Sequence, residues 1–391
     1  MGGILGPTPE SSQGFIAISP ARQKHGDPWW LLTLGLISLG AQAFWLGPRL
    51  GGDSGRYLEG AQRLAQGLEL VDKQADFPAY AWLVQLTGAT PEAPWLLVSL
   101  QAGLSILAGL VLYRAGREAF GRLAGLAAAA LYLAWPDLQR WNLYLLTDGP
   151  FNSALAICLG LSLICEKRPL AWLGLLPALL ALAFLRPDGT IFYLPLAAGL
   201  LAQRHPGQAL SLLVLGAVIW LWRTPSPRAV ADLMEQWRLG TVIWGHAPPL
   251  GGLGLEDSAF HGSLAGMLWR ALVHDPFQVL GIMLQRAFWF LAHARPYYST
   301  AHNLLAAGSS LLLLVLAIWG SITSLAGGRQ RVAAWGLVLT QLCLVCLTWA
   351  DWDGRFLTRV TPALILLAAD ALLGQTDPDP NLGGSRRFLH L

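Results

Sequence analysis

Charged side chains are scarce in this sequence of 391 residues, where Asp, Glu, Lys and Arg together make up 13%. Soluble domains carry about 25% charged residues. Hydrophobic residues reach 54% of the chain, so the protein cannot present a polar surface to water on all sides. The net charge of +3 gives no basic surface of the kind that binds nucleic acid. We therefore expect an all-α integral membrane protein whose apolar surface contacts the lipid bilayer.

Cysteine is rare as well, and all four cysteines lie inside apolar runs: Cys158, Cys165, Cys343 and Cys346. Cys343 and Cys346 form a CxxC pair, a spacing found in redox and metal sites. Here the pair stands midway along a Leu- and Val-rich run, without the polar neighbours that support such a site. We interpret all four as packed or lipid-facing residues.

Apolar runs that approach the roughly 20 residues needed to cross a bilayer recur along the chain. They predict about ten spans, at 29–47, 94–113, 121–135, 145–165, 170–185, 189–202, 209–222, 303–325, 332–349 and 357–374. Residues 1–28 are polar and are expected to form a cytoplasmic N-terminal tail. Residues 29–374 would form one polytopic membrane domain, and residues 375–391 a cytoplasmic C-terminal tail.

Lysine and arginine in the short loops predict the orientation, because cytoplasmic loops are enriched in them. With the N-terminus inside, each inner loop carries positive charge, at 114–122, 166–168, 204–205 and 329–331. The alternating loops are long, or short with acidic residues. We expect both termini to be cytoplasmic and the protein to lie in a bacterial cytoplasmic (inner) membrane.

Two outer segments, about 48–93 and 223–302, are too long to be simple turns. In the first, Tyr57, Ala61, Leu64 and Leu68 recur at helical spacing between polar residues, which predicts an amphipathic helix lying in the membrane interface. The second has a Pro- and Gly-rich middle at 248–252, followed by an expected helix over 275–293.

Histidines also gather in or beside the second outer segment, among them His246, His261, His293 and His302. Their spacing matches no common pattern of metal ligands. A divalent metal is an open alternative without support, so we predict no metal site and no cofactor. Instead, we expect some of these side chains, His293 in particular, to contact a substrate.

Ionisable residues are almost absent from the middles of the spans and stand at their outer ends instead. Acids and bases recur together in Arg186-Pro187-Asp188 and in the segment 351–355. Holding such groups at the hydrocarbon edge is costly, so their recurrence favours a functional role, whereas we interpret Arg359 as an arginine that extends to the aqueous interface. A guanidinium in this position is suited to bind a lipid-borne phosphate through paired hydrogen bonds.

The order of these segments resembles a known superfamily. Gly52-Asp53-Ser54-Gly55-Arg56-Tyr57, followed by Asp76-Phe77-Pro78-Ala79-Tyr80, resembles the first periplasmic loop of GT-C glycosyltransferases, polytopic enzymes that use polyprenyl-phosphate sugars. Protein O-mannosyltransferases and the aminoarabinose transferases of lipid A are the members it is most similar to in style. Thr147-Asp148-Gly149-Pro150, Phe184-Leu185-Arg186-Pro187-Asp188-Gly189 and Asp353-Gly354-Arg355-Phe356 resemble three further segments. The chain departs from the pattern by having one acid at position 53, Asp148 in place of Glu, and Phe356 in place of Tyr.

The resemblance implies a GT-C-type helical bundle and a donor such as a sugar on undecaprenyl phosphate. The acceptor would be a hydroxyl or amine on a lipid, glycan or protein at the non-cytoplasmic face. Asp53 would be the general base, although an N-cap for the following helix is the alternative, and Asp148 is the second catalytic candidate. Arg186, Arg355 and Arg295 would stabilise the departing phosphate. The other expected substrate-binding residues are Tyr57, Tyr80, Asp188, Asp353, His293 and Tyr297.

Tyr297 has the alternative of being an interfacial aromatic residue. Two other functions are open for the whole chain. One is a lipid or sugar transporter or flippase, which the apolar span centres disfavour, because transporters place polar groups near the bilayer midplane. The other is a non-catalytic membrane subunit.

Overall fold

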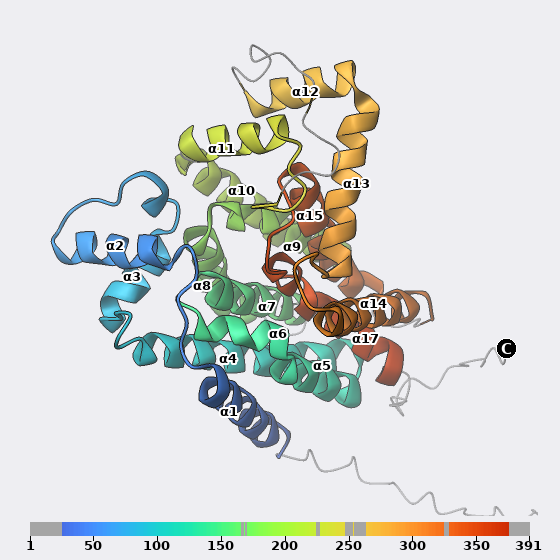
Figure 1. The fold of residues 1–391 in the computed structure, drawn as a ribbon. Helices are drawn as coiled ribbons and strands as arrows, with labels where there is room; N and C mark the ends of the chain where they lie inside the picture. The colour runs from blue at the N-terminus through green and yellow to red at the C-terminus, as the bar shows by residue number, and fades with distance from the viewer. Residues whose placement is uncertain are drawn as a thin grey trace, which may run out of the picture.

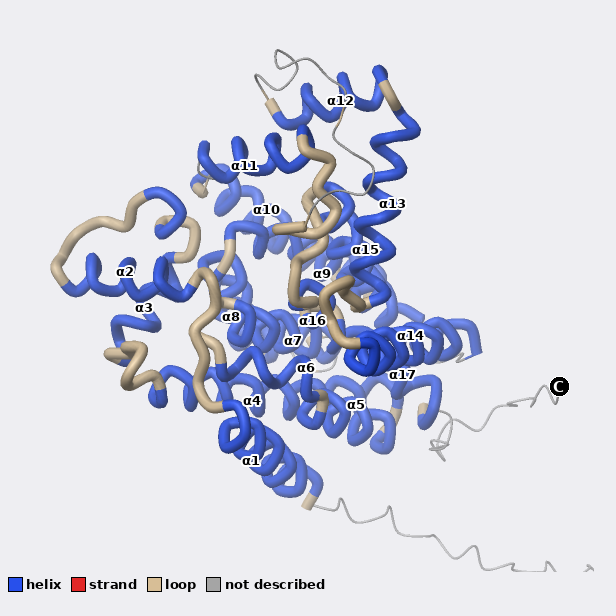
Figure 2. The backbone as a smooth tube through the Cα atoms, viewed as in Figure 1, coloured by secondary structure: helices blue, strands red, loops and turns tan. Residues whose placement is uncertain are grey.

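The computed structural model describes residues 26–165, 168, 170–223, 227–246, 253, 263–323 and 328–374. These residues form a helical protein (Figure 1), and the loops drawn in tan in Figure 2 join its helices. The first helices are α1 (Asp27–Leu46), α2 (Ser54–Ala65), η1 (Asp72–Gln74), α3 (Pro78–Thr87), α4 (Trp95–Phe120), α5 (Arg122–Ala134), α6 (Pro136–Gln139), η2 (Arg140–Leu143) and α7 (Asp148–Ile164). The remainder are α8 (Ala171–Leu185), η3 (Pro187–Phe192), α9 (Tyr193–Ala202), α10 (Pro206–Trp222), α11 (Pro227–Arg238), α12 (Leu264–His274), α13 (Pro276–Ala292), α14 (Thr300–Thr323), α15 (Gly328–Leu347), α16 (Arg355–Thr358) and α17 (Thr361–Leu373).

The centre of the bundle is built around α7 and α17, which bury nearly all of their residues. Both helices are apolar around their whole circumference, as expected of helices enclosed by other helices. α4 packs against α5 and α7, α14 against α17, and α15 against α9. The outer helices of the bundle leave large apolar side chains exposed, including Phe44, Leu221 and Ile322, as expected of a protein surrounded by lipid.

The number of spans differs in detail from the expected ten. Four described helices, α1, α4, α14 and α15, are long and apolar enough to cross a membrane alone. Other apolar helices have 10–17 residues, among them α5, α7, α8 and α17. New helical elements begin at Pro136 and Pro187, next to positions 135 and 185 where the sequence predicts spans to end, since proline cannot continue a helix. The count of ten therefore stays a prediction.

Both long segments predicted to lie outside, 48–93 and 223–302, contain helices in the structure. α2 buries Tyr57 and Ala61 on the predicted face, but it ends at Ala65 and leaves Leu68 exposed. α13 confirms the helix expected over 275–293: the Asp275 side chain accepts a hydrogen bond from the Gln278 backbone N–H, and His293 ends the helix. α11 and α12 were not predicted. The segment 248–252, His261 and nearly all of the two predicted tails lie outside the described residues.

Contacts between loops occur at opposite ends of the bundle. Both long outer segments meet, because Lys73 pairs with Asp232 and the Arg223 Nη2 donates to the Asp76 carbonyl at 2.7 Å. At the opposite end, the Arg122 Nε lies 2.6 Å from Asp27. Which end faces the cytoplasm stays a prediction.

Candidate active site

Asp148 is the centre of a buried charged cluster at the end of the bundle that we predict to face outward. It is the first residue of α7, and its side chain is 1% exposed. Its carboxylate is surrounded by three guanidiniums: Arg186 Nη1 and Arg355 Nη1 lie 3.4 Å away, and Arg359 Nη2 lies 4.0 Å away. A carboxylate at the first turn of a helix is further stabilised by the positive end of the helix dipole. Asp148 is therefore a buried carboxylate with three arginine side chains around it.

Asp188 pairs with two of the same arginines from the turn that follows α8. Its Oδ1 lies 3.2 Å from Arg186 Nε, and its Oδ2 accepts a hydrogen bond of 2.7 Å from Arg359 Nη1. Burial alone raises the pKa of a carboxyl group, but the charges of Arg186 and Arg359 outweigh it and lower the pKa of Asp188 to about 2. Asp188 is therefore an anion at physiological pH.

Asp53 lies at the open side of this cluster, immediately before α2. Its Oδ2 is 3.7 Å from Arg355 Nη1, its Oδ1 is 3.2 Å from Arg56 Nη2, and its side chain is 33% exposed. The side chain makes no capping hydrogen bond to α2. The alternative N-cap interaction is therefore absent for this residue, and its carboxylate is instead directed to the arginines.

Asp353 approaches Arg355 from the loop before α16, with Asp353 Oδ1 3.7 Å from Arg355 Nε. Burial and the neighbouring charge of Asp351 raise the pKa of Asp353 to about 8. Asp351 itself pairs with Arg295, which keeps the pKa of Asp351 low. The loop therefore holds one ionised acid and one that is largely protonated at neutral pH.

A second group of charges adjoins Asp353. Asp137 accepts from His293 Nε2 at 2.8 Å and pairs with Arg140 at 2.7 Å, and the Arg140 Nη2 donates to the Asp353 carbonyl at 3.0 Å. His293 packs against Gly354, which has a φ of +80°; a Cβ atom there would lie 2.7 Å from His293 Cε1. His293 thus contacts Asp137 and the backbone of the loop, and it lies beside the cluster around Asp148.

Arg295 and Tyr297 are placed differently from the other predicted site residues. The Arg295 side chain is buried, and its donors bond to the carbonyls of Asp351, Trp289 and Ala294 at 2.6–2.8 Å. It holds the loop before α16. Tyr297 is exposed and stacks on His246 with ring centroids 4.6 Å apart. The structure does not bring either residue to Asp148.

Tyr57 and Tyr80 lie behind the cluster and support it. Their rings meet edge to face with centroids 4.9 Å apart, and the Tyr80 hydroxyl donates to Gln101 Oε1 at 2.9 Å. Burial, together with the charge of Asp53, raises the pKa of Tyr57 to about 12. Both phenols are therefore neutral packing partners of the acids and arginines above them.

The sequence interpretation of Arg359 was wrong. Its side chain is 1% exposed and pairs with Asp188 instead of extending to the interface. Arg359 stands four residues after Arg355, a spacing that places both on one face of a helix, and this signal was available in the sequence. Asp137 and Arg140 were also missed. Among the described residues, no group of three or more His, Cys, Asp or Glu side chains is arranged to hold a metal ion.

The helical bundle, with loops gathered over a charged cluster at one end, has the fold of GT-C glycosyltransferases, which confirms the predicted fold class. The chain is similar to the archaeal oligosaccharyltransferase AglB from Archaeoglobus fulgidus in complex with an inhibitory peptide and a dolichol-phosphate. The TM-score is 0.50 and the identity 14%, over 89% of this chain and 50% of that chain.

It is also similar to ArnT from Cupriavidus metallidurans in the apo state, with a TM-score of 0.50 and 18% identity over 88% of this chain and 59% of that chain. A structure of the same ArnT bound to undecaprenyl phosphate aligns with a TM-score of 0.49 and 16% identity. The chain thus spans 50–59% of the length of these proteins. No protein-family model and no curated protein matches the sequence.

Proposed function

We propose that this protein is a membrane glycosyltransferase that moves a sugar from a polyprenyl-phosphate carrier to an acceptor hydroxyl or amine. The observation that carries the proposal is that Arg186 and Arg355 are held in the cluster but remain partly exposed. Their side chains are 14% and 18% exposed, whereas Arg359 is 1% exposed. Arg355 reaches its acids only at 3.4–3.7 Å, longer than a charge-assisted hydrogen bond. It is therefore a fixed cation available to a phosphate.

The cluster supplies the groups that the reaction needs. The acceptor oxygen or nitrogen attacks the anomeric carbon, and the bond from that carbon to the phosphate oxygen breaks. The electron pair leaves with the polyprenyl phosphate, where Arg355 and Arg186 stabilise the negative charge. The acceptor proton passes to Asp53, the more exposed of the two catalytic candidates. Asp148 and Asp188 hold the arginines in place. The dolichol-phosphate named for AglB fits this class of donor.

The alternative of a transporter or flippase is less favoured. Transporters bind their substrates near the bilayer midplane, whereas the acids and arginines of this protein stand at helix ends: Asp148 begins α7, and Arg186 follows α8. A non-catalytic subunit predicts a chain that transfers no sugar when purified alone.

The test is to purify the full chain, analyse its retained lipids by mass spectrometry, and assay transfer in proteoliposomes with polyprenyl-phosphate sugars. We expect a co-purifying polyprenyl phosphate that is lost in Arg355→Ala and kept in Arg49→Ala, since Arg49 is an exposed arginine at the same end. Movement of an intact lipid-linked sugar across the bilayer without cleavage would contradict the transferase and indicate a flippase instead.

A further inference from the structure

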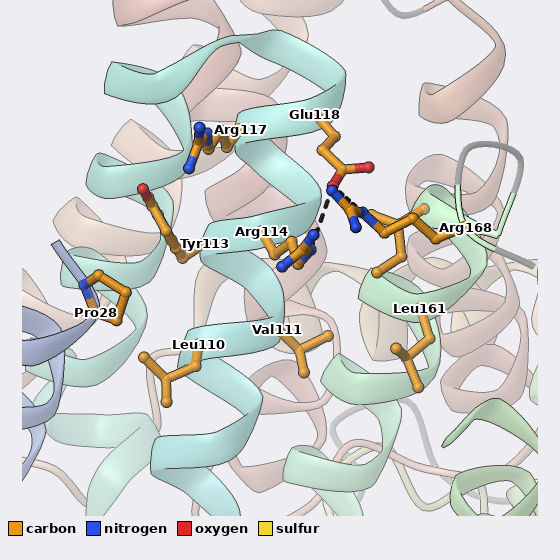
Figure 3. Close-up of a pocket in the computed structure, with 10 residues that line it drawn as sticks. Pro28, Leu110, Val111, Tyr113, Arg114, Arg117, Glu118, Leu161 and Arg168 are labelled. Carbon is orange, nitrogen blue, oxygen red and sulfur yellow. Dashed lines mark hydrogen bonds and ion pairs between the residues drawn. The ribbon is translucent and has the colours of Figure 1, made fainter. Parts of the chain in front are cut away.

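A cavity of about 730 Å³ lies at the end of the bundle opposite to the charged cluster. It is formed by α4, the last turn of α7, Pro28 at the start of α1, and Arg168 (Figure 3). α7 runs from Asp148 in the cluster to Ile164 in the cavity wall, which separates the two by about 24 Å at 1.5 Å per residue. The cavity is therefore distinct from the proposed transferase site.

One part of the cavity is positively charged. Arg114, Arg117 and Arg168 line it together with a single acid, Glu118. Arg168 Nε lies 2.8 Å and Arg114 Nε 3.3 Å from Glu118 Oε1, as the dashed lines in Figure 3 show. Three guanidiniums against one carboxylate leave two positive charges in excess. Arg114 and Arg168 also stay about half exposed, at 47% and 53%, so both can accept a further anion.

The other part of the cavity is aliphatic. Leu110 and Val111 lie one turn before Arg114 on α4, and Leu161 and Ile164 face them from α7. In Figure 3 the side chains of Leu110, Val111 and Leu161 lie along the helices below the arginines. A soluble anion would gain nothing from this wall. An amphiphile with a phosphate headgroup and hydrocarbon chains matches both parts of the cavity.

We propose that this cavity binds one anionic glycerophospholipid of the surrounding membrane. The headgroup phosphate contacts Arg114, Arg117 and Arg168, and an acyl chain lies against Leu110 and Leu161. Basic pockets between membrane helices on the cytoplasmic side recognise anionic headgroups in this way, and the positive-inside pattern predicts that side for this end. The proposal goes beyond the transferase and does not depend on it.

Native mass spectrometry of the full chain in detergent, with equal phosphatidylglycerol and phosphatidylcholine, tests the proposal. We expect the wild type to retain phosphatidylglycerol at least about tenfold better. Arg117→Gln removes one net positive charge. The triple variant Arg114→Gln/Glu118→Gln/Arg168→Gln also removes one net positive charge, and it neutralises Glu118 together with its two arginine partners. Each should lower the preference about fivefold, as a basic residue near an anionic membrane surface does.

Arg204→Gln is the matched control, because Arg204 is an exposed arginine in another predicted inner loop, and its preference should equal that of the wild type. Leu110→Trp, which fills the aliphatic wall and keeps every charge, should lower retention of phosphatidylglycerol too. Equal retention of the two lipids by the wild type would overturn the proposal. Displacement of the lipid by millimolar glycerol 3-phosphate, or an equal loss in Arg204→Gln, would overturn it as well.

Discussion

Arg359 Nη1 donates a hydrogen bond of 2.7 Å to Asp188 Oδ2, although the two residues stand 171 positions apart in the sequence. The bond joins the turn after α8 to the start of the last helices. Removing one partner of a buried ion pair costs about 3–5 kcal/mol, because a charge is left without compensation. Arg186 still contacts Asp188, so we expect Arg359→Met to lose about 3 kcal/mol. Denaturant unfolding measures this, and Arg359→Met/Asp188→Asn should recover part of the loss.

Arg186 and Arg355 are expected to hold the donor phosphate. Replacing either with Ala should weaken binding of polyprenyl phosphate by at least about tenfold, since hydrogen bonds to charged groups contribute about 1.5–3 kcal/mol. Lys should restore binding only in part, because the ammonium lacks the planar fork of donors. Titration with a short-chain polyprenyl phosphate measures the affinity. Wild-type affinity in both Ala variants would remove these residues from the site.

Asp53→Asn tests whether Asp53 acts as the general base or has only a structural role. The variant keeps the size of the side chain and loses the basic carboxylate, so transfer should fall about 100-fold or more while donor binding persists. Because the carboxylate makes no capping bond, Asp53→Ala should melt close to the wild type. Turnover and melting temperature of both variants decide the matter, and an active Asp53→Asn would transfer the role of base to Asp148.

Asp353 predicts a specific dependence of stability on pH. Its pKa is raised to about 8 by burial and by the charge of Asp351, against about 3.9 in an unfolded chain. The folded protein therefore binds the extra proton, and this contribution, fully present below about pH 4, is lost as the pH rises through 8. The wild type should lose more melting temperature between pH 7 and 9 than Asp353→Asn does. Glu59→Gln, an exposed acid on α2, should behave as the wild type.

The pair formed by Lys73 and Asp232 predicts that both long segments lie on one side of the membrane. In a chain without its native cysteines, Lys73→Cys and Asp232→Cys should both react with a membrane-impermeant maleimide in intact cells. Arg204→Cys should react only after the membrane is permeabilised. Reaction at just one of the two outer positions would contradict the predicted arrangement of loops.

Sequence patterns predicted the elements whose cause is local. Helix α13 follows from its apolar run and the capping residue Asp275, and α2 follows from the spacing of Tyr57 and Ala61. The gathering of Asp148, Arg186 and Arg355 followed from alternation of loops across the bilayer, because residues at outer span ends must lie at one end of a bundle. The number of spans stays a prediction, since several apolar helices have only 10–17 residues, fewer than the roughly 20 that cross a bilayer alone.

Pairings between distant segments could not be predicted from the chain. Nothing near Asp137 in the sequence indicates that its partner is His293. The pattern of apolar residues likewise does not indicate that Arg359 is buried against Asp188. Arg295 was assigned to substrate for its position at a span end, and only the structure places its donors on three backbone carbonyls. Its role as a substrate ligand stays a prediction.

The close approach of Gly354 to the His293 ring restricts what evolution can place at position 354. A side chain there would meet the imidazole at 2.7 Å and would also have to adopt a positive φ of +80°, a conformation that glycine alone adopts readily. Because the constraint on φ holds whatever residue stands at 293, position 354 should stay glycine in relatives of this chain even where position 293 changes.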